Sequence, residues 1–94
     1  MARDITEKAV RALLAGQNFK QSNTQVVDGS VYLFGNEIAT KEGRKLKISL
    51  CGWNTVTTRE RLNGLPRVNI KQIKGIPYLN GEPMDTREIY TVAI

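Results

Sequence analysis

The residues best suited to bind a ligand lie between positions 45 and 71, and their chemistry fits the phosphates of a nucleic acid. Hydroxyl, amide and guanidinium groups stand at a predicted helix N-terminus, where free backbone N–H groups and the helix dipole favour an anion. A tryptophan just before them can stack on a base or a sugar. The candidate nucleic-acid-binding residues are Lys45, Lys47, Trp53, Asn54, Thr55, Thr58, Arg59, Arg61 and Lys71. The hypothesis is therefore non-catalytic contact with the backbone of DNA or RNA.

The net charge of +5 is concentrated in the middle third of the chain. Residues 41–74 carry nine basic side chains against two acidic ones, whereas residues 1–40 sum to zero and residues 75–94 to −2. A basic segment of this kind indicates an anionic partner. The competing interpretation is a solvated basic surface that only keeps the protein soluble.

The same residues also have explanations that involve no ligand. The asparagine and threonine side chains can cap the helix that follows them, and this is the favoured interpretation of that cluster. Trp53 can anchor the core beneath a turn from strand to helix, so we expect its ring to be mostly buried.

We do not expect an enzyme. The chain has no histidine, which excludes Ser–His and Cys–His nucleophile pairs and any histidine-based metal site. Its lone cysteine, Cys51, has no visible base and is expected to be a buried or half-buried thiol. The isolated glycines form no phosphate-binding loop. We predict neither a cofactor nor a metal ion.

The central helix must position the candidate site, and a capping box predicts where it starts. Thr57 and Glu60 have the three-residue spacing at which each side chain caps the backbone N–H of the other. Gly64 is expected to end the helix in the left-handed conformation. Residues 45–50 alternate between polar and apolar side chains, which predicts a half-buried strand that leads into Trp53.

A first helix is predicted over Asp4–Ala15, with Asp4 as its cap and Gly16 as its end. Its apolar stripe consists of Ile5, Ala9, Val10, Leu13 and Leu14. Such a stripe on a chain with few other helical residues is expected to cover one face of a sheet.

Short strands joined by local turns make up the rest of the prediction. Strands at 24–27, 30–34, 37–40 and 45–50 are separated by turns at Asp28-Gly29, Gly35-Asn36 and Glu42–Arg44. After the central helix come a strand at 67–71, a hairpin at Asn80-Gly81 and a terminal strand at 88–94. Pro77 and Pro83 confine that hairpin to a sheet edge or a loop. The predicted fold is a single α+β domain, residues 1–94, in which an antiparallel meander carries the N-terminal helix on one face, with a short second helix.

Parts of this sequence resemble small proteins of unknown function from tailed bacteriophages and prophages. The resemblance rests on Gly52–Thr55, Thr57–Asn63, Tyr78–Gly81 and the Tyr-Leu-x-Gly-Asn pattern of Tyr32–Asn36. It implies a phage or prophage source acting in the host bacterial cytoplasm, and it implies no reaction. A single cysteine agrees with a reducing compartment, and neither a signal peptide nor a membrane span is predicted.

The competing functional hypothesis is a module that binds and modulates a host or phage protein, or a structural, oligomeric protein. The hairpin Ile76–Met84 and the terminal strand are its candidate surfaces. Either can add to a partner's sheet or pair with a second copy in a homodimer.

Overall fold

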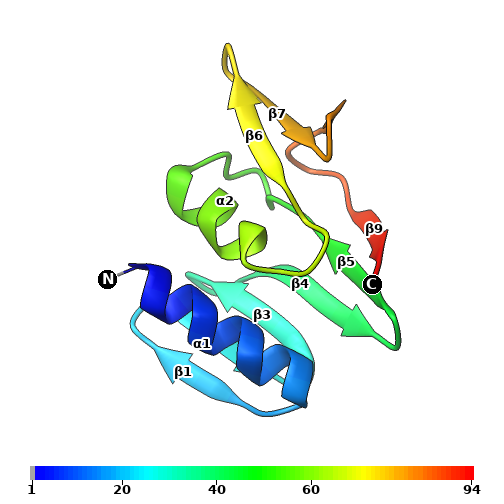
Figure 1. Ribbon diagram of the computed structural model, residues 1–94. Helices are drawn as coiled ribbons and strands as arrows, with labels where there is room; N and C mark the ends of the chain where they lie inside the picture. The colour runs from blue at the N-terminus through cyan, green and yellow to red at the C-terminus, as the bar shows by residue number, and fades with distance from the viewer. Residues whose placement is uncertain (1) are drawn as a thin grey trace.

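An antiparallel sheet of six strands forms the larger part of the structure, in the strand order β1-β2-β3-β4-β5-β9 (Figure 1). The computed structural model describes residues 2–94. A small second sheet has the order β6-β7-β8. The elements are α1 (Ala2–Ala15), β1 (Phe19–Gln21), β2 (Thr24–Val27), β3 (Ser30–Leu33), β4 (Asn36–Glu42), β5 (Lys45–Ile48), α2 (Val56–Asn63), β6 (Ile70–Ile73), β7 (Ile76–Leu79), β8 (Glu82–Pro83) and β9 (Tyr90–Ala93). The predicted α+β class and the antiparallel meander are confirmed.

One face of the large sheet carries the core, and α1 lies across β1, β2 and β3 on that face (Figure 1). The predicted alternation of β5 is confirmed, because Leu46 and Ile48 are buried while Lys45 and Lys47 are exposed. The terminal strand β9 pairs antiparallel with β5 and forms one edge of the sheet. Its Val92 side chain is part of the core.

The first helix differs from its prediction at both the cap and the stripe. It begins at Ala2, so Asp4 lies in the first turn rather than at the cap. Leu14 is 43% exposed, whereas the unpredicted Thr6 and Ala12 are buried. Gly16 ends the helix as predicted, with φ 70°.

Two-residue turns with positive φ join most of the strands. Asp28-Gly29 and Asn80-Gly81 form the predicted hairpins, and in each the two residues have φ near 50° and above 80°. The turn between β3 and β4 is Phe34-Gly35, one residue earlier than predicted, because the following Asn36 already pairs with Leu33.

Pro77 lies at a position in the small sheet that differs from the predicted one. An unpredicted turn at Lys74-Gly75 joins β6 to β7, so Pro77 lies in the middle strand rather than at an edge or in a loop. The backbone of Pro77 faces β8, and its carbonyl accepts a hydrogen bond of 3.0 Å from Met84 N. No N–H is needed from residue 77 on that side, so the position tolerates proline. The predicted connection after α1 also contains the short strand β1.

The N-cap of the second helix lies two residues before the predicted one. Thr55 is the N-cap, with φ −111° and ψ 160°, and its Oγ1 accepts a hydrogen bond of 3.2 Å from Thr58 N. The capping box of Thr57 and Glu60 is therefore wrong. Gly64 is also not left-handed, because its φ is −76°.

Gly64 has a different role from the one predicted for it. A Cβ at this position would lie 2.4 Å from Thr6 Cγ2 and 3.1 Å from Val10 Cγ2, both on α1. The absence of a side chain therefore allows the end of α2 to approach α1 closely.

Candidate functional site

An apolar pocket of about 350 Å³ opens between the β3–β4 turn and the loop that leads into α2. Phe34 and Trp53, which are 71% and 58% exposed, stand on its rim. The lining residues are Leu33, Phe34, Asn36, Ile38, Trp53, Thr55 and Thr58. We call this feature the Phe34–Trp53 pocket.

The predicted burial of Trp53 is wrong, and the local backbone explains why. Leu50, just before the turn, is fully buried in the core. Cys51 and Gly52 then adopt positive φ angles of 53° and 79°, and Trp53 N donates to Leu50 O at 2.8 Å. This tight turn sends the tryptophan ring to the surface.

The turn that carries Trp53 is held on both sides. Cys51 is half-buried, as predicted, and its Sγ donates to the carbonyl of Glu37 on β4 at 3.0 Å. Its backbone N–H donates to Ser49 Oγ at 3.0 Å. Gly52 N donates to Thr86 O at 2.7 Å. The tryptophan therefore projects from an anchored loop.

Phe34 has an unusual backbone for an aromatic residue. It occupies the first position of a two-residue turn with φ 51°, where glycine, asparagine or aspartate is ordinarily found. A bulky side chain in this region costs of order 1–3 kcal/mol and is associated with functional positions. Sequence reasoning missed Phe34, although an aromatic residue directly before the glycine of a predicted tight turn was the available signal.

Three side chains join the loop of the pocket to the small sheet. Arg59 Nη1 donates to Asn54 Oδ1 and, at 3.0 Å, to Gln72 Oε1 on β6. Asn54 Nδ2 donates to the same Gln72 oxygen at 2.8 Å. Within residues 2–94 the Arg59 guanidinium is bonded to amide oxygens and forms no ion pair with a carboxylate.

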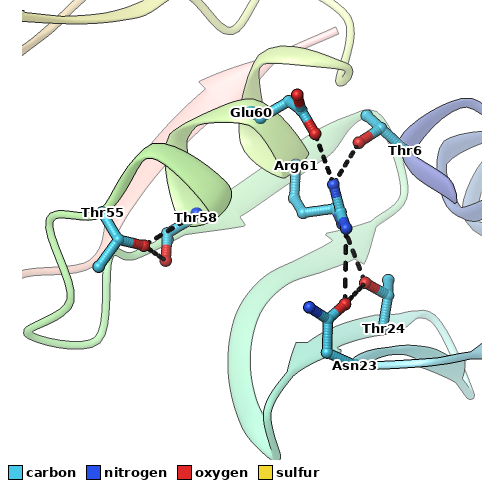
Figure 2. Close-up of polar contacts among 7 residues, drawn as sticks. All are labelled: Thr6, Asn23, Thr24, Thr55, Thr58, Glu60 and Arg61. Carbon is cyan, nitrogen blue, oxygen red and sulfur yellow. Dashed lines mark hydrogen bonds and ion pairs between the residues drawn. The ribbon is translucent and has the colours of Figure 1, made fainter. Parts of the chain in front are cut away.

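Two of the predicted site residues are buried, which removes them from any surface for nucleic acid. Thr58 is 2% exposed, and its hydroxyl lies 2.9 Å from that of Thr55 (Figure 2). Arg61 is 5% exposed and donates to Thr6, Thr24 and Glu60. Arg61 therefore links the two helices to β2 inside the protein.

The three predicted lysines do not gather around the pocket. Lys45 and Lys47 lie on the face of the large sheet opposite the core, where Lys47 pairs with Glu42 at 3.2 Å. Lys71 is opposite Tyr78 in the small sheet, on the face away from its neighbour Gln72. The β4–β5 and β6–β7 turns lie at opposite ends of the molecule (Figure 1). Trp53, Asn54, Thr55 and Arg59 are thus the predicted site residues that the structure brings together.

A comparison with protein-family models matches residues 2–91 to the Kyanoviridae Gp96 protein. The chain belongs to the Kyanoviridae Gp96 family. The phage origin implied by the sequence resemblance is confirmed. No curated protein and no solved structure matches this Gp96-family chain.

Two further observations concern the described residues of the Gp96-family protein. None of the helices described within residues 2–94 has the length and apolarity needed to cross a membrane. Across the same residues, no group of three or more His, Cys, Asp or Glu side chains is placed to hold a metal ion.

Proposed function

We propose that this phage protein is a non-catalytic protein-binding module, and that the Phe34–Trp53 pocket accepts an apolar side chain of another protein. The observation that carries the proposal is the exposure of two aromatic rings on the rim of one apolar pocket. Val56, the first residue of α2, is 73% exposed and adds apolar surface three residues beyond Trp53.

The physical chemistry of the pocket favours a protein partner. Its volume of about 350 Å³ lies within the range of roughly 300–1,000 Å³ for binding pockets, which are mostly apolar. Aromatic side chains around a desolvated pocket contribute most of the binding energy at many protein interfaces. An apolar anchor side chain in the pocket would remove both rings from water.

The strain at Phe34 supports the same proposal. A turn residue selected only for stability would be asparagine or glycine, which tolerate φ 51° better than phenylalanine does. An aromatic ring at 71% exposure gains little from burial within this chain. Its retention is explained if the ring is buried against a partner.

The position of Arg59 favours a partner that carries an acidic group beside its apolar anchor. Its guanidinium is held in place by Asn54 and Gln72, and neither amide neutralises its charge. A carboxylate close to the apolar anchor of the partner would form a charge-assisted hydrogen bond with this preorganised group.

The nucleic-acid hypothesis predicts a surface on which cations converge near Trp53. Arg61 is buried, Lys47 is paired with Glu42, and Lys71 lies on the far face of the small sheet. Arg59 is the one predicted cation beside the pocket, and the side chain of Arg87 lies close to Gly52. Two cations give little of the counterion release on which backbone binding depends. The protein partner is therefore the better-supported choice.

Site-specific photo-crosslinking in phage-infected host cells tests the proposal. A photoreactive amino acid replaces Val56, which lies beside the pocket without lining it. We expect a discrete protein adduct that is lost when Trp53→Ser or Phe34→Ser is combined with the probe. A probe at Leu14, an exposed apolar residue on α1, is the matched control and should not give this adduct.

Two results would overturn the proposal. An adduct that nuclease digests would assign the pocket to a nucleic acid, with Trp53 stacking on its bases. An adduct that both serine variants retain would show that the pocket does not select the partner.

A further inference from the structure

The strand β9 lies at one edge of the large sheet, and no strand within residues 2–94 covers its outer side (Figure 1). Ile94 N donates to Arg44 O at 2.8 Å, so this opposed pair is hydrogen-bonded. Because bonded and non-bonded pairs alternate in an antiparallel ladder, Val92 also bonds to β5 while Thr91 and Ala93 do not. The backbone N–H and C=O groups of Thr91 and Ala93 therefore point outward from the sheet.

The other strand edges of the described chain are at least partly protected, and β9 is not. At the opposite edge of the large sheet, β1 has three residues, carries the exposed Lys20 and contacts α1. At one edge of the small sheet, β8 has two residues and ends in Pro83. At the other edge, the side chain of Asn63 forms hydrogen bonds with both the N–H and the carbonyl of Ile70 on β6. Short strands, lysine and proline are the usual means of blocking edge pairing. Strand β9 contains neither lysine nor proline.

The two faces beside β9 differ in chemistry. On the core face, Tyr90 and Ile94 are half-buried and pack against the core. Part of their apolar surface is therefore still exposed to solvent at this edge. On the outer face, Lys45 lies across from Ala93. Lys47 pairs with Glu42, whereas Lys45 forms no ion pair with any residue the structure describes.

We propose that β9 binds an extended segment of another protein in which apolar residues alternate with acidic ones. Residues of that segment paired with Thr91 and Ala93 face outward, beside the lysines of β5, and are acidic. Residues between them face inward and extend the core beyond Tyr90 and Ile94. Neighbouring strands are about 4.8 Å apart, so a glutamate on the added strand and Lys45 can meet above the short side chain of Ala93.

Charge decides between this occupant and a second copy of the chain. A second copy of β9 would place no carboxylate beside Lys45, because the residues of β9 are uncharged. An acidic strand supplies the opposite charge and the same backbone hydrogen bonds. This edge is separate from the Phe34–Trp53 pocket, since none of the residues of β9 lines that pocket.

The test uses heteronuclear NMR of the whole protein with two capped hexapeptides, one of alternating valine and glutamate and one of alternating valine and lysine. We expect the glutamate peptide to bind with a dissociation constant of about 1 mM or tighter. Its binding should protect the amides of Thr91 and Ala93 from hydrogen exchange. The lysine peptide should bind at least about tenfold more weakly.

Two proline variants locate the binding, and a third variant tests its charge preference. Ala93→Pro removes an outward N–H that the internal ladder does not use, and it should reduce affinity at least about tenfold while the protein stays folded. Lys20→Pro is the matched control, because its N–H also points outward, from the opposite edge, and it should leave affinity unchanged. Lys45→Glu tests the charge without changing the backbone, and it should reverse the preference between the two peptides.

Three results would overturn the proposal. The first is no change at Thr91 or Ala93 with the glutamate peptide at about 10 mM. The second is equal affinity for both peptides. The third is concentration-dependent protection of β9 without any peptide, which would make a second copy the occupant. None of these results bears on crosslinking at Val56, so this proposal and the proposed function can fail separately.

Discussion

The side chains of Arg61 and Thr24 are joined by a hydrogen bond of 2.9 Å from Nε to Oγ1, which ties α2 to β2 inside the protein (Figure 2). Nη1 of the same guanidinium donates to Thr6 on α1 at 2.9 Å and to Glu60 at 2.7 Å. A buried cation with this set of acceptors orients both helices on the sheet. Arg61 is thus a structural residue, and the positive charge that it adds to the sequence is not presented to a partner.

Replacement of Arg61 with methionine should destabilise the protein by about 2–4 kcal/mol. The variant keeps an unbranched apolar chain to about the position of Nε, but it leaves the buried hydroxyls of Thr6 and Thr24 without this donor. Urea unfolding measures the loss. Arg59→Met is the control and should cost less than about 1 kcal/mol, because Arg59 is only partly buried. Equal costs for the two variants would contradict the structural role of Arg61.

The only tryptophan of the chain should behave as a surface residue. Iodide should quench Trp53 fluorescence strongly in the native protein, because the side chain is 58% exposed. Trp53→Ser should change the free energy of unfolding by no more than about 0.5 kcal/mol. Weak quenching together with a loss of several kcal/mol would mean that the ring is part of the core.

Replacement of Phe34 with asparagine should raise stability and abolish binding. Asparagine tolerates the positive φ of this turn, so the unfolding free energy should increase by about 0.5–1 kcal/mol. The Val56 crosslink should be lost in the same protein. A variant that is less stable than the wild type would show that the Phe34 ring contributes to folding.

The cap of α2 can be located by two alanine substitutions. Thr55→Ala should cost about 1 kcal/mol, because Thr55 Oγ1 accepts from Thr58 N. Thr57→Ala should be nearly neutral, since Val56 and Thr57 are already inside the helix. Thermal unfolding followed by circular dichroism measures the stability of both variants. A larger loss of stability for Thr57→Ala than for Thr55→Ala would show that Thr57 is the cap.

Gly64 should tolerate no side chain while Thr6 retains its methyl group. Gly64→Ala should cost about 1–3 kcal/mol by overpacking, although its φ of −76° is open to alanine. Thr6→Ser removes Cγ2 but keeps the hydroxyl that accepts from Arg61. The double variant should therefore recover part of the loss, and strict additivity in a double-mutant cycle would argue against the contact.

Most of the regular elements were predictable from the sequence because their signals are local. The alternation of residues 45–48 and the turn chemistry of Asp28-Gly29 and Asn80-Gly81 act between neighbours, and the structure agrees with each. The terminal strand was found by the same alternation. Its partner β5 could not be identified, because the choice of partner depends on the whole sheet.

The candidate site was predictable only in part, because burial is a property of the tertiary structure. Threonines 55 and 57 carry the same cap chemistry, and only the packed loop selects Thr55. Trp53 was expected to be buried and is exposed, whereas Arg61 was expected at the surface and is buried. The cations of the basic segment are close in sequence, but they are divided among a sheet face, the core and the small sheet.

The pairing of β5 with β9 has a consequence for how the protein folds. Every other neighbouring pair of strands in the two sheets is consecutive in the chain and joined by a short connection. Such hairpins form from local contacts, whereas β9 must close a long loop that includes α2 and the entire small sheet. Strand β9 is therefore expected to dock late in folding and to detach first from the native state, and its amides should exchange by a sub-global opening that leaves the other five strands paired.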